Sequence, residues 1–537
     1  MYQCRYDETR LIYFSERLSV QSELEERKIV RNCYWQVIVR VEMLHNVYRC
    51  EVSLSDSSSW IGVGQVIATE YKWLVLTVTT VGAFMAAVDE NIVFVGLPSV
   101  LHELHASLVE GVWVIAGYAL STTILLVAFG RVSDLFGKVK LYILGFATFT
   151  VASALCGLSQ TGSQLVFFRL IQGIGAALLL VNSVVLVADA FPSYELGTAL
   201  GLNFMAWNVG AIAGYTLGGF IVQLLGWRFI FFVNIPIGIF GTLWAHARLK
   251  ETRQVVSEKF DYLGTIWYSC GLTLILVALT LEGSSLSLIL TLLFVGILAF
   301  LIFVVVEQRE AHPALDLELF KIRLFSAGNV ASFLNSLAYN SVPFIVTFYL
   351  QLVLHLNPLV TGLMFIPMEA VVLVVGPISG RLSDRHGARG LSSLGLLCNA
   401  AAIFWISTLH QSSSYSELIL ALAFFGVGRG LFASPNASSI MSKIPPESRG
   451  VANGVRLTLV FTAIVISVPL CLAFMSLAIP YQLLTQIAQG TVTTISETTA
   501  FLTALRYALH ISALLVLLAI VPSLLRGQPK NRIGPAI

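Results

Sequence analysis

Charged residues are scarce in this chain. Asp, Glu, Lys and Arg make up 12% of its 537 residues, whereas apolar types make up 56%. A soluble globular protein carries about 25% charged residues, so a chain of this length cannot cover a soluble surface with polar groups. The mean hydropathy of +0.82 agrees with this shortage. The scarcity of charge excludes a set of soluble domains and predicts an integral membrane protein.

Several functional signals are also missing. The 32 basic and 30 acidic residues leave a net charge of only +2, so the excess of positive charge that nucleic-acid binding needs is absent. No G-x-x-x-x-G-K-[ST] nucleotide loop occurs, and none of the seven cysteines has C-x-x-C metal spacing. No large polar region could house catalysis. We therefore expect no nucleic acid, nucleotide, metal or cofactor, and no enzymatic activity.

Long apolar runs dominate the rest of the chain. A helix that spans a bilayer needs about 20 mostly apolar residues, and fourteen stretches meet this requirement. They are 73–97, 110–130, 141–159, 164–188, 198–223, 229–247, 262–281, 286–306, 327–352, 359–380, 391–409, 417–438, 450–476 and 501–525. The connections between them are short, so consecutive helices must be antiparallel neighbours. The sequence predicts an all-α polytopic membrane protein.

The basic residues of the loops predict the orientation. With the N-terminus inside, the inner loops hold nearly all loop Lys and Arg, and the outer loops hold only Arg228. Because cytoplasmic loops carry the excess of Lys and Arg, we expect both termini in the cytoplasm and the chain in the plasma membrane.

Residues 1–71 differ from the remainder, with eight basic and ten acidic residues and no apolar run long enough to span a membrane. They lack the layout of a signal peptide. The alternation of Val37, Val39 and Val41 hints at a short strand. We interpret this segment as a cytoplasmic extension.

A repeat divides the chain into two halves. The pattern G-R-x-S-D-x-x-G occurs at 130–137 and again at 380–387, an offset of 250. Pro192, Gly197, Ala199 and Gly201 likewise match Pro445, Gly450, Ala452 and Gly454 at an offset of 253. We therefore predict six-helix bundles at 72–250 and 323–527, a two-helix insertion at 251–322 and a tail at 528–537. Repeated halves in a membrane suggest transport by alternating access.

These motifs resemble the major facilitator superfamily and, within it, the fourteen-span drug:proton antiporter branch. The repeated loop is similar to the signature loop of the superfamily. The segment 89–98 is similar to the first-span motif of the branch, which is roughly L-D-x-T-I-V-N-V-A-L-P. Segments 169–175 and 227–238 are like its fourth-span and sixth-span motifs, and Gly210, Gly214, Gly218 and Gly219 resemble its fifth-span antiporter motif.

The resemblance implies a proton-coupled exporter of amphipathic organic compounds or drugs, in which a small-molecule substrate and the bilayer are the only partners and the chain is a monomer. Three departures stand out: Tyr215 takes the place of the usual Pro, and Asn91 and Phe94 replace Thr and Asn. They keep open an exporter or symporter of one specific metabolite, and sodium in place of protons. A non-transporting membrane sensor on the same fold is a third possibility.

Ionisable residues within the spans are the candidates for coupling. A charge at the bilayer centre costs about 2.5–3.5 kcal/mol or more, so such residues are functional candidates. Asp89 holds the acidic position of the family, and Glu90 points about 100° away from it around the helix. Glu369 is mid-span and must face the bundle interior, where it could instead form a structural pair with Arg429 or Arg456. In the family Arg169 is associated with proton coupling; a structural alternative is a donor to backbone carbonyls.

Polar and aromatic residues on other spans predict the substrate cavity. We place in it Asn91, Gln172, Asn203, Trp207, Asn208, Asn335, Tyr339, Asn340 and Arg429. Trp207 and Tyr339 could stack on an organic substrate, although packing roles are equally open.

The repeated loops have a different expected role. Asp134 and Asp384 sit in turns and can face a helix N-terminus, and in the family these loops latch the halves together. The latch set is Gly130, Arg131, Asp134, Gly137, Gly380, Arg381, Asp384, Arg385 and Gly387. Gly210, Gly214 and Gly218 form a stripe that allows close helix packing, which the family places between the halves.

Overall fold

The computed structural model describes residues 38–44, 47–53, 60–251, 262–281, 285–310, 317–444, 449–490 and 495–527. The chain divides into two compact units, Met1–Leu74 and Val75–Ile537. In the first unit, β1 (Ile38–Leu44) pairs antiparallel with β2 (Val47–Ser53), and Ile38 lies opposite Ser53. The strand expected from alternating valines is therefore present, although Val37 lies outside the described residues.

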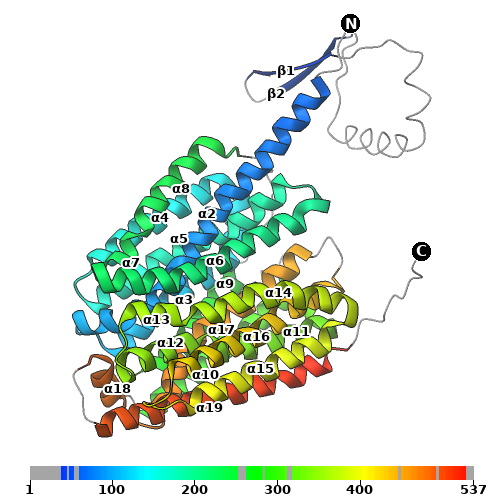
Figure 1. The fold of residues 1–537 in the computed structure, drawn as a ribbon. Coiled ribbons are helices and arrows are strands. Elements are labelled where there is room, and N and C mark those ends of the chain that lie inside the picture. The colour runs from blue at the N-terminus through cyan, green and yellow to red at the C-terminus, as the bar shows by residue number, and fades with distance from the viewer. Residues whose placement is uncertain are drawn as a thin grey trace. The chain divides into compact units, whose positions relative to one another are not determined.

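The second unit is a bundle of membrane-spanning helices (Figure 1). Fourteen helices in the described part of the chain are long and apolar enough to cross a membrane, which confirms the predicted number of spans. The first half contains α2 (Trp60–Glu103), α3 (Leu108–Phe136), α4 (Lys138–Leu158), α5 (Gly162–Ala190), α6 (Ser193–Leu225), α7 (Phe229–Phe232) and α8 (Asn234–Arg248). The inserted pair is α9 (Tyr262–Thr280) and α10 (Leu286–Arg309).

The second half begins with a short 3₁₀ helix, η2 (Leu317–Lys321). Its first span is built from α11 (Arg323–Tyr339), α12 (Ser341–Phe348) and a π-helical turn, η3 (Tyr349–Val353). The remaining elements are α13 (Pro358–Met364), α14 (Ile366–His386), α15 (Ala388–Thr408), α16 (Tyr415–Met441), α17 (Arg449–Ser476), α18 (Tyr481–Ala488) and α19 (Ile495–Leu525).

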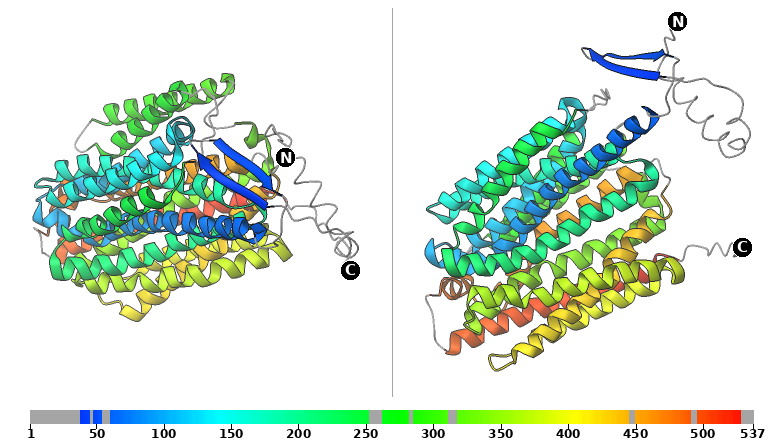
Figure 2. Two further views of the ribbon diagram at one scale, coloured as in Figure 1. Left: turned by 90° about the horizontal axis from the view of Figure 1, so that it is seen from above. Right: turned by 45° about the horizontal axis from the view of Figure 1, so that its top comes forward.

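The helices of the two halves pack in the same pattern. In the first half α5 packs on α3 and α4, and α8 packs on α4; in the second half α16 packs on α14 and α15, and α19 packs on α15. Between the halves, α6 contacts α13 and α14, and α3 contacts α17 (Figures 1 and 2). The inserted α9 packs on α10, α3 and α17. The fold is therefore two pseudo-symmetric six-helix bundles with a two-helix insertion.

The repeated loop has the same backbone geometry in both halves. Gly137 and Gly387 have φ of 101° and 83°, and each donates its N–H to a serine carbonyl, Ser133 or Ser383. Such positive φ values favour glycine, which explains the last glycine of the motif. The expectation that Asp134 and Asp384 sit in turns was wrong, since α3 runs to Phe136 and α14 to His386. Hydropathy detects only the apolar part of a helix and misses a polar extension beyond the bilayer.

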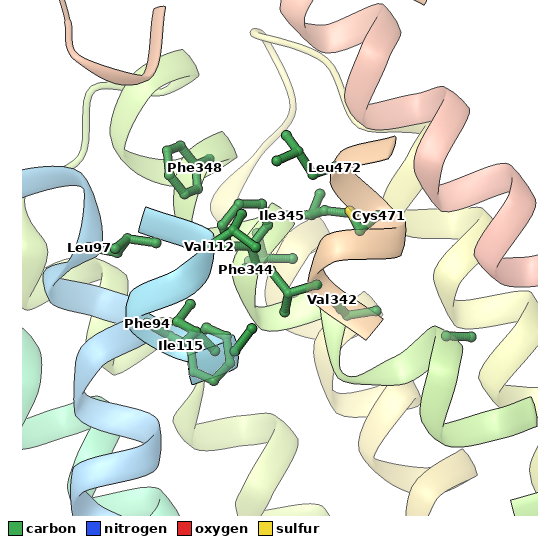
Figure 3. Close-up of a cluster of buried hydrophobic side chains, with 14 of the residues drawn as sticks. Phe94, Leu97, Val112, Ile115, Val342, Phe344, Ile345, Phe348, Cys471 and Leu472 are labelled. Carbon is green, nitrogen blue, oxygen red and sulfur yellow. The ribbon is translucent and has the colours of Figure 1, made fainter. Parts of the chain in front are cut away.

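The two ends of the bundle differ in how tightly the halves meet. We call the end with the repeated loops the latch end and the other the far end. Toward the far end, a group of buried apolar side chains lies between the halves (Figure 3). This apolar seal contains Phe94, Leu97, Val112, Ile115, Val342, Phe344, Ile345, Phe348, Cys471 and Leu472.

Backbone contacts reinforce the seal. A Cβ added at Gly219 would clash with the Pro358 carbonyl, and one at Gly362 would clash with the Tyr215 carbonyl. Gln351 also donates a hydrogen bond of 2.9 Å to the Val95 carbonyl across the two halves. At the latch end, by contrast, a Cβ on Gly197, Gly201 or Gly376 would meet no described atom within 4 Å. The halves are thus closed at the far end.

Candidate functional site

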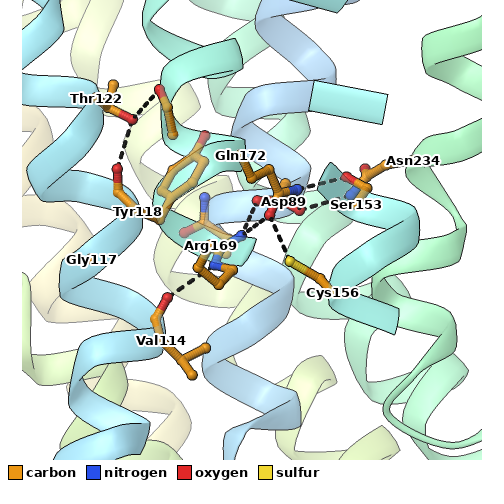
Figure 4. A network of polar contacts seen from close by, with 12 residues as sticks. Asp89, Val114, Gly117, Tyr118, Thr122, Ser153, Cys156, Arg169, Gln172 and Asn234 are labelled. Carbon is orange, nitrogen blue, oxygen red and sulfur yellow. Dashed lines mark hydrogen bonds and ion pairs between the residues drawn. The ribbon is translucent and has the colours of Figure 1, made fainter. Parts of the chain in front are cut away.

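A buried ion pair lies at the centre of the first half (Figure 4). Arg169 of α5 donates to Oδ2 of Asp89 on α2 at 2.5 Å, and the two side chains are 1% and 0% exposed. Gln172 and Asn234 donate to the other carboxylate oxygen at 2.8 and 2.7 Å. Asp89 therefore has its charge compensated and both its oxygens hydrogen-bonded, as a buried carboxylate requires.

The same network ties Arg169 to the neighbouring helices. Its Nε donates to the Val114 carbonyl of α3 at 2.9 Å, and its guanidinium lies 4.2 Å from the centre of the Tyr118 ring. Gln172 donates to Ser153 of α4 at 2.7 Å. The expected bond to a backbone carbonyl is present, and Arg169 also pairs with a carboxylate; its role in proton coupling stays a prediction. The ion pair and its hydrogen-bond partners together connect α2, α3, α4, α5 and α8.

Glu90 has entirely different surroundings from Asp89. It is partly exposed and lines a narrow cavity between the halves together with Phe94, Tyr118, Arg169 and Asn340. Ile115, Ala119, Ile464 and Val468 complete the lining. Among the residues that the structure describes, none forms a hydrogen bond or an ion pair with the Glu90 carboxylate. One carboxylate of the Asp89-Glu90 pair is thus enclosed by partners, and the other faces the cavity.

A second buried ion pair lies in the second half. Arg429 of α16 donates to Glu369 of α14 at 2.5 Å, where Glu369 is 3% and Arg429 20% exposed. The guanidinium of Arg429 lies 5.0 Å from the Tyr339 ring centre. Of the two structural partners considered for Glu369, the structure selects Arg429, and Arg456 instead donates to Asn453.

The two pairs are related by the repeat, but with two roles exchanged. Each arginine is on the fourth helix of its half. In the first half the carboxylate is on the first helix and the tyrosine, Tyr118, on the second. In the second half the tyrosine, Tyr339, is on the first span and the carboxylate on the second. Each half therefore contains one arginine that is neutralised by a carboxylate of the same half.

The other predicted cavity residues are scattered. Asn340 lines the cavity, and Asn335 accepts a hydrogen bond from Asn399. Asn203 donates to Ser183, while Asn91 and Asn208 donate to carbonyls of their own helices. Trp207 is partly exposed on α6. Sequence alone could not separate these roles, because each depends on how α6, α11 and α15 rotate about their axes.

The predicted latch residues are partly described. The side chains of Gly130, Arg131, Asp134 and Asp384 lie outside the described residues, and Arg381 and Arg385 are exposed. A Cβ on Gly380 would lie 2.7 Å from the Ser434 hydroxyl. One carboxylate that faces a helix start at this end is Glu251, which accepts from the backbone N–H groups of Val139 and Lys140 at 3.3 and 3.2 Å.

The glycine stripe of α6 lies against α2 of its own half. A Cβ on Gly210, Gly214 or Gly218 would come within 3 Å of atoms of Phe84, Val88, Asn91 or Ile92. Gly219, on the adjoining face, meets α13 of the other half. The stripe therefore allows close packing within the first half, and Gly219 alone of the four provides the contact across the halves.

Sequence reasoning missed three members of the site. Asn234 and Ser153 belong to the Asp89 network, and Tyr118 lies under Arg169. Asn234 had a signal, since it lies within the sixth-span segment 227–238. Ser153 and Tyr118 had none, because a serine or a tyrosine in an apolar run is common and its partner is set by packing.

Comparison with known proteins gives consistent matches. A family model described as Major Facilitator Superfamily matches residues 79–468. The chain is 33% identical to the riboflavin transporter RibZ of Clostridioides difficile, over 71% of this chain and 83% of that protein. It is 31% identical to the tetracenomycin C resistance and export protein of Streptomyces glaucescens, over 72% of each chain.

Solved structures match in fold. A bacterial homologue of the human lysosomal transporter Spinster, in an inward-facing and unoccupied conformation, has a TM-score of 0.61 at 15% identity. The match covers 85% of this chain and 97% of that one.

Proposed function

This chain belongs to the major facilitator superfamily, and from that premise we propose that it exports amphipathic organic compounds in exchange for protons. It is a multi-pass membrane transporter and not an enzyme. Fourteen candidate spans and relatives with drug-resistance names agree with the fourteen-span antiporter branch. Export is supported by the name of one relative, the tetracenomycin C resistance and export protein, and drugs as substrates by the name of another, a multidrug resistance protein.

The observation that carries proton coupling is the position of Glu90. A carboxylate that lines a mainly apolar cavity between two halves that rock against each other can take up a proton from one side and release it to the other. The adjacent Asp89–Arg169 pair offers a second route, because a proton on Asp89 would release the guanidinium. Either route needs only an ion gradient and no cofactor.

The oligomeric state, the membrane and the orientation complete the proposal. We propose a monomer in the plasma membrane with the latch end in the cytoplasm, where the loops of the repeat stabilise one of the two conformers. The latch must stabilise its conformer only modestly. A substrate or proton shifts the equilibrium between the two conformers only by the difference in its affinity for them, and this difference has to exceed the stability of the latch.

A specific metabolite is the second candidate. It is favoured by the 33% identity to a protein named as a riboflavin transporter, and by Tyr215 at the usual proline position. The two candidates predict different substrate ranges.

Transport into proteoliposomes with an imposed pH gradient separates these candidates. The panel includes riboflavin, tetracenomycin C and chemically unrelated amphipathic dyes, each with a proton or a sodium gradient. Drug export predicts proton-driven transport of several unrelated compounds. Transport of riboflavin alone favours the metabolite candidate, and activity with sodium alone contradicts proton coupling.

A further inference from the structure

The inserted helix α9 is hydrogen-bonded to both halves of the bundle. The hydroxyl of Thr280, its last residue, accepts a hydrogen bond from the Trp113 indole of α3 at 3.1 Å. Nearer the start of α9, the hydroxyl of Tyr268 lies 2.6 Å from that of Thr462 on α17. The two bonds are about 18 Å apart along the helix, at a rise of roughly 1.5 Å per residue. One helix outside the repeat thus holds α3 of the first half and α17 of the second.

These contacts are enclosed by protein. Tyr268, Thr280 and Thr462 are 3%, 5% and 6% exposed. The Tyr268 ring also packs against Phe300 and Phe303 of α10, with ring centres 5.7 and 5.5 Å away. In apolar surroundings a polar group without a partner is costly, so each hydrogen bond restrains the helices that it joins.

The two inserted helices form one packed unit. A Cβ on Gly271 of α9 would lie 3.1 Å from the Gly296 carbonyl of α10, and one on Gly296 would lie 3.2 Å from the Gly271 carbonyl. Such small residues allow two helix backbones to approach closely. A movement of α9 therefore carries α10 with it.

This unit crosses the line along which the two halves meet. The helices α3 and α17 pack on each other, and α9 packs on both. Val112 of α3 and Leu472 of α17 belong to the apolar seal (Figure 3), and Trp113 directly follows Val112. The bond of Trp113 to α9 thus lies beside the seal, whereas Thr462 lies near the middle of α17.

Opening of the far end affects the two bonds differently. Alternating access requires α3 and α17 to part at that end, since one half rocks against the other. The displacement in a rocking movement grows with distance from the pivot, so it is largest beside the seal and small at the middle of α17. The end of α9 cannot follow both helices. The Trp113–Thr280 bond must therefore break, while the Tyr268–Thr462 bond persists.

We propose that the inserted pair α9 and α10 is a strap across the two halves. It moves with the second half, and its Trp113–Thr280 bond stabilises the conformer that is closed at the far end. This bond breaks each time the far end opens. The inference rests on alternating access by the proposed transporter, and it does not depend on the substrate or on the coupling ion.

Matched threonine substitutions test the strap. Thr280→Val and Thr462→Val each remove one hydroxyl and keep the side-chain shape, and each of these hydroxyls also bonds a carbonyl of its own helix four residues earlier. Spin labels on cysteines at Gln160 and Ser412, exposed far-end positions of the first and second half, report the width of the far end. Pulsed electron paramagnetic resonance on the otherwise cysteine-free full chain in lipid nanodiscs gives the ratio of open to closed molecules.

The two substitutions have different expected results. Thr280→Val should raise the open-to-closed ratio roughly threefold, the factor for about 0.6 kcal/mol, which is the average for a hydrogen bond between spanning helices. Thr462→Val should leave the ratio unchanged, because its bond is present in both conformers. An unchanged ratio in Thr280→Val contradicts the strap. An equal rise in Thr462→Val contradicts movement of the inserted pair with the second half.

Cross-links give a second measurement that removes no bond between the helices. Cysteine pairs at positions 113 and 280, or at 268 and 462, are joined by a short cross-linker with two thiol-reactive groups. Amide hydrogen exchange of α12, which contributes to the seal, is compared before and after cross-linking in each protein. The 113–280 link should slow this exchange, and the 268–462 link should not. No change with the first link, or equal slowing by both, contradicts the proposal.

Neither assay contains a substrate or an ion gradient, so the strap and the proposed export can fail separately. Negative results in a chain whose far end opens contradict the strap alone, and absence of proton-driven transport contradicts the proposed export alone. A wild type whose spin labels never reach an open distance contradicts alternating access, and with it both proposals.

Discussion

At the scale of single residues, Asp89 and Glu90 are neighbours in sequence but differ in exposure and in hydrogen-bond partners. Asp89 is fully buried and accepts hydrogen bonds from Arg169, Gln172 and Asn234. Glu90 lines the cavity without a hydrogen-bonding or ion-pair partner among the described residues. The 100° between adjacent helix positions is sufficient to produce this difference. Their two substitutions should therefore have different phenotypes.

Asp89→Asn tests whether the buried acid exchanges a proton. If it does, proton-driven transport should be lost, while exchange of substrate at equal pH survives because it needs no net proton movement. Glu369→Gln is the matched substitution in the second half. If Asp89→Asn retains full uphill transport and Glu369→Gln loses it, the proton site belongs to the second half.

Arg169→Gln should destabilise the first half, because it leaves Asp89 buried without a counter-charge. Breaking a buried ion pair from one side costs about 3–5 kcal/mol. Thermal unfolding of the purified protein measures the loss. The double substitution Asp89→Asn with Arg169→Gln removes both charges and should recover part of the stability. Additive losses would show that the two side chains do not interact.

The pairing of these side chains marks the limit of sequence reasoning. Asp89, Arg169, Glu369 and Arg429 could all be selected from sequence, since an ionisable group in an apolar span is conspicuous. The choice of Arg429 over Arg456 as partner of Glu369 could not, because it depends on the rotation of α16 and α17 about their axes.

At the scale of elements, glycines set how closely helices approach. Gly214 of α6 lies against α2, where an added Cβ would be 2.7 Å from the Val88 carbonyl. Gly201 lies on the same helix, where an added Cβ would meet no described atom within 4 Å. The two positions therefore separate packing from helix propensity.

Gly214→Ala should lower thermal stability and transport, because α6 must move away from α2. Gly201→Ala is the control, and it should be neutral or stabilising by up to about 1 kcal/mol, since alanine is the better helix former. The comparison uses melting temperatures in one detergent. Equal effects of both substitutions would contradict the packing role of Gly214.

The helices themselves were well predicted, and for a simple reason. A span of about 20 apolar residues is a strong signal, so all fourteen were found. Their ends and interruptions were not. The break between α11 and α12 at Asn340 and the π-helical turn at 349–353 arise within an apolar run, where hydropathy does not change.

At the scale of the whole molecule, the halves meet at the far end, so transport by alternating access requires the far end to open. The backbone carbonyl of His105 in the first half accepts a hydrogen bond from the side-chain amide of Gln489, which follows α18 of the second half. Cysteines at these two positions in a cysteine-free background, joined by a short cross-linker with two thiol-reactive groups, should stop transport. A cysteine pair at Glu110 and Ser163 is the control, because the Ser163 hydroxyl donates to the Glu110 carboxylate at 2.6 Å within the first half. Cross-linking this pair should not stop transport. Undiminished transport after cross-linking 105 to 489 would contradict far-end opening.

The topology gives a separate expectation. A membrane-impermeant thiol reagent added to intact cells should label a cysteine at Ser412, in the far-end connection between α15 and α16. It should not label one at Arg385, at the latch end. The reverse pattern would place the latch end outside the cell and invert the predicted orientation.

The self-neutralised arginines also determine how the transporter responds to voltage. Because each half carries its own ion pair, movement of one half against the other leaves both pairs intact, and Glu90 is a carboxylate without an ion-pair partner in the described lining of the cavity. Exchange of one proton for one organic monocation moves no net charge across the membrane. Such exchange is electroneutral, so membrane potential should not alter its rate. A neutral substrate would make the cycle electrogenic, and 100 mV would then contribute about 2.3 kcal/mol per charge moved.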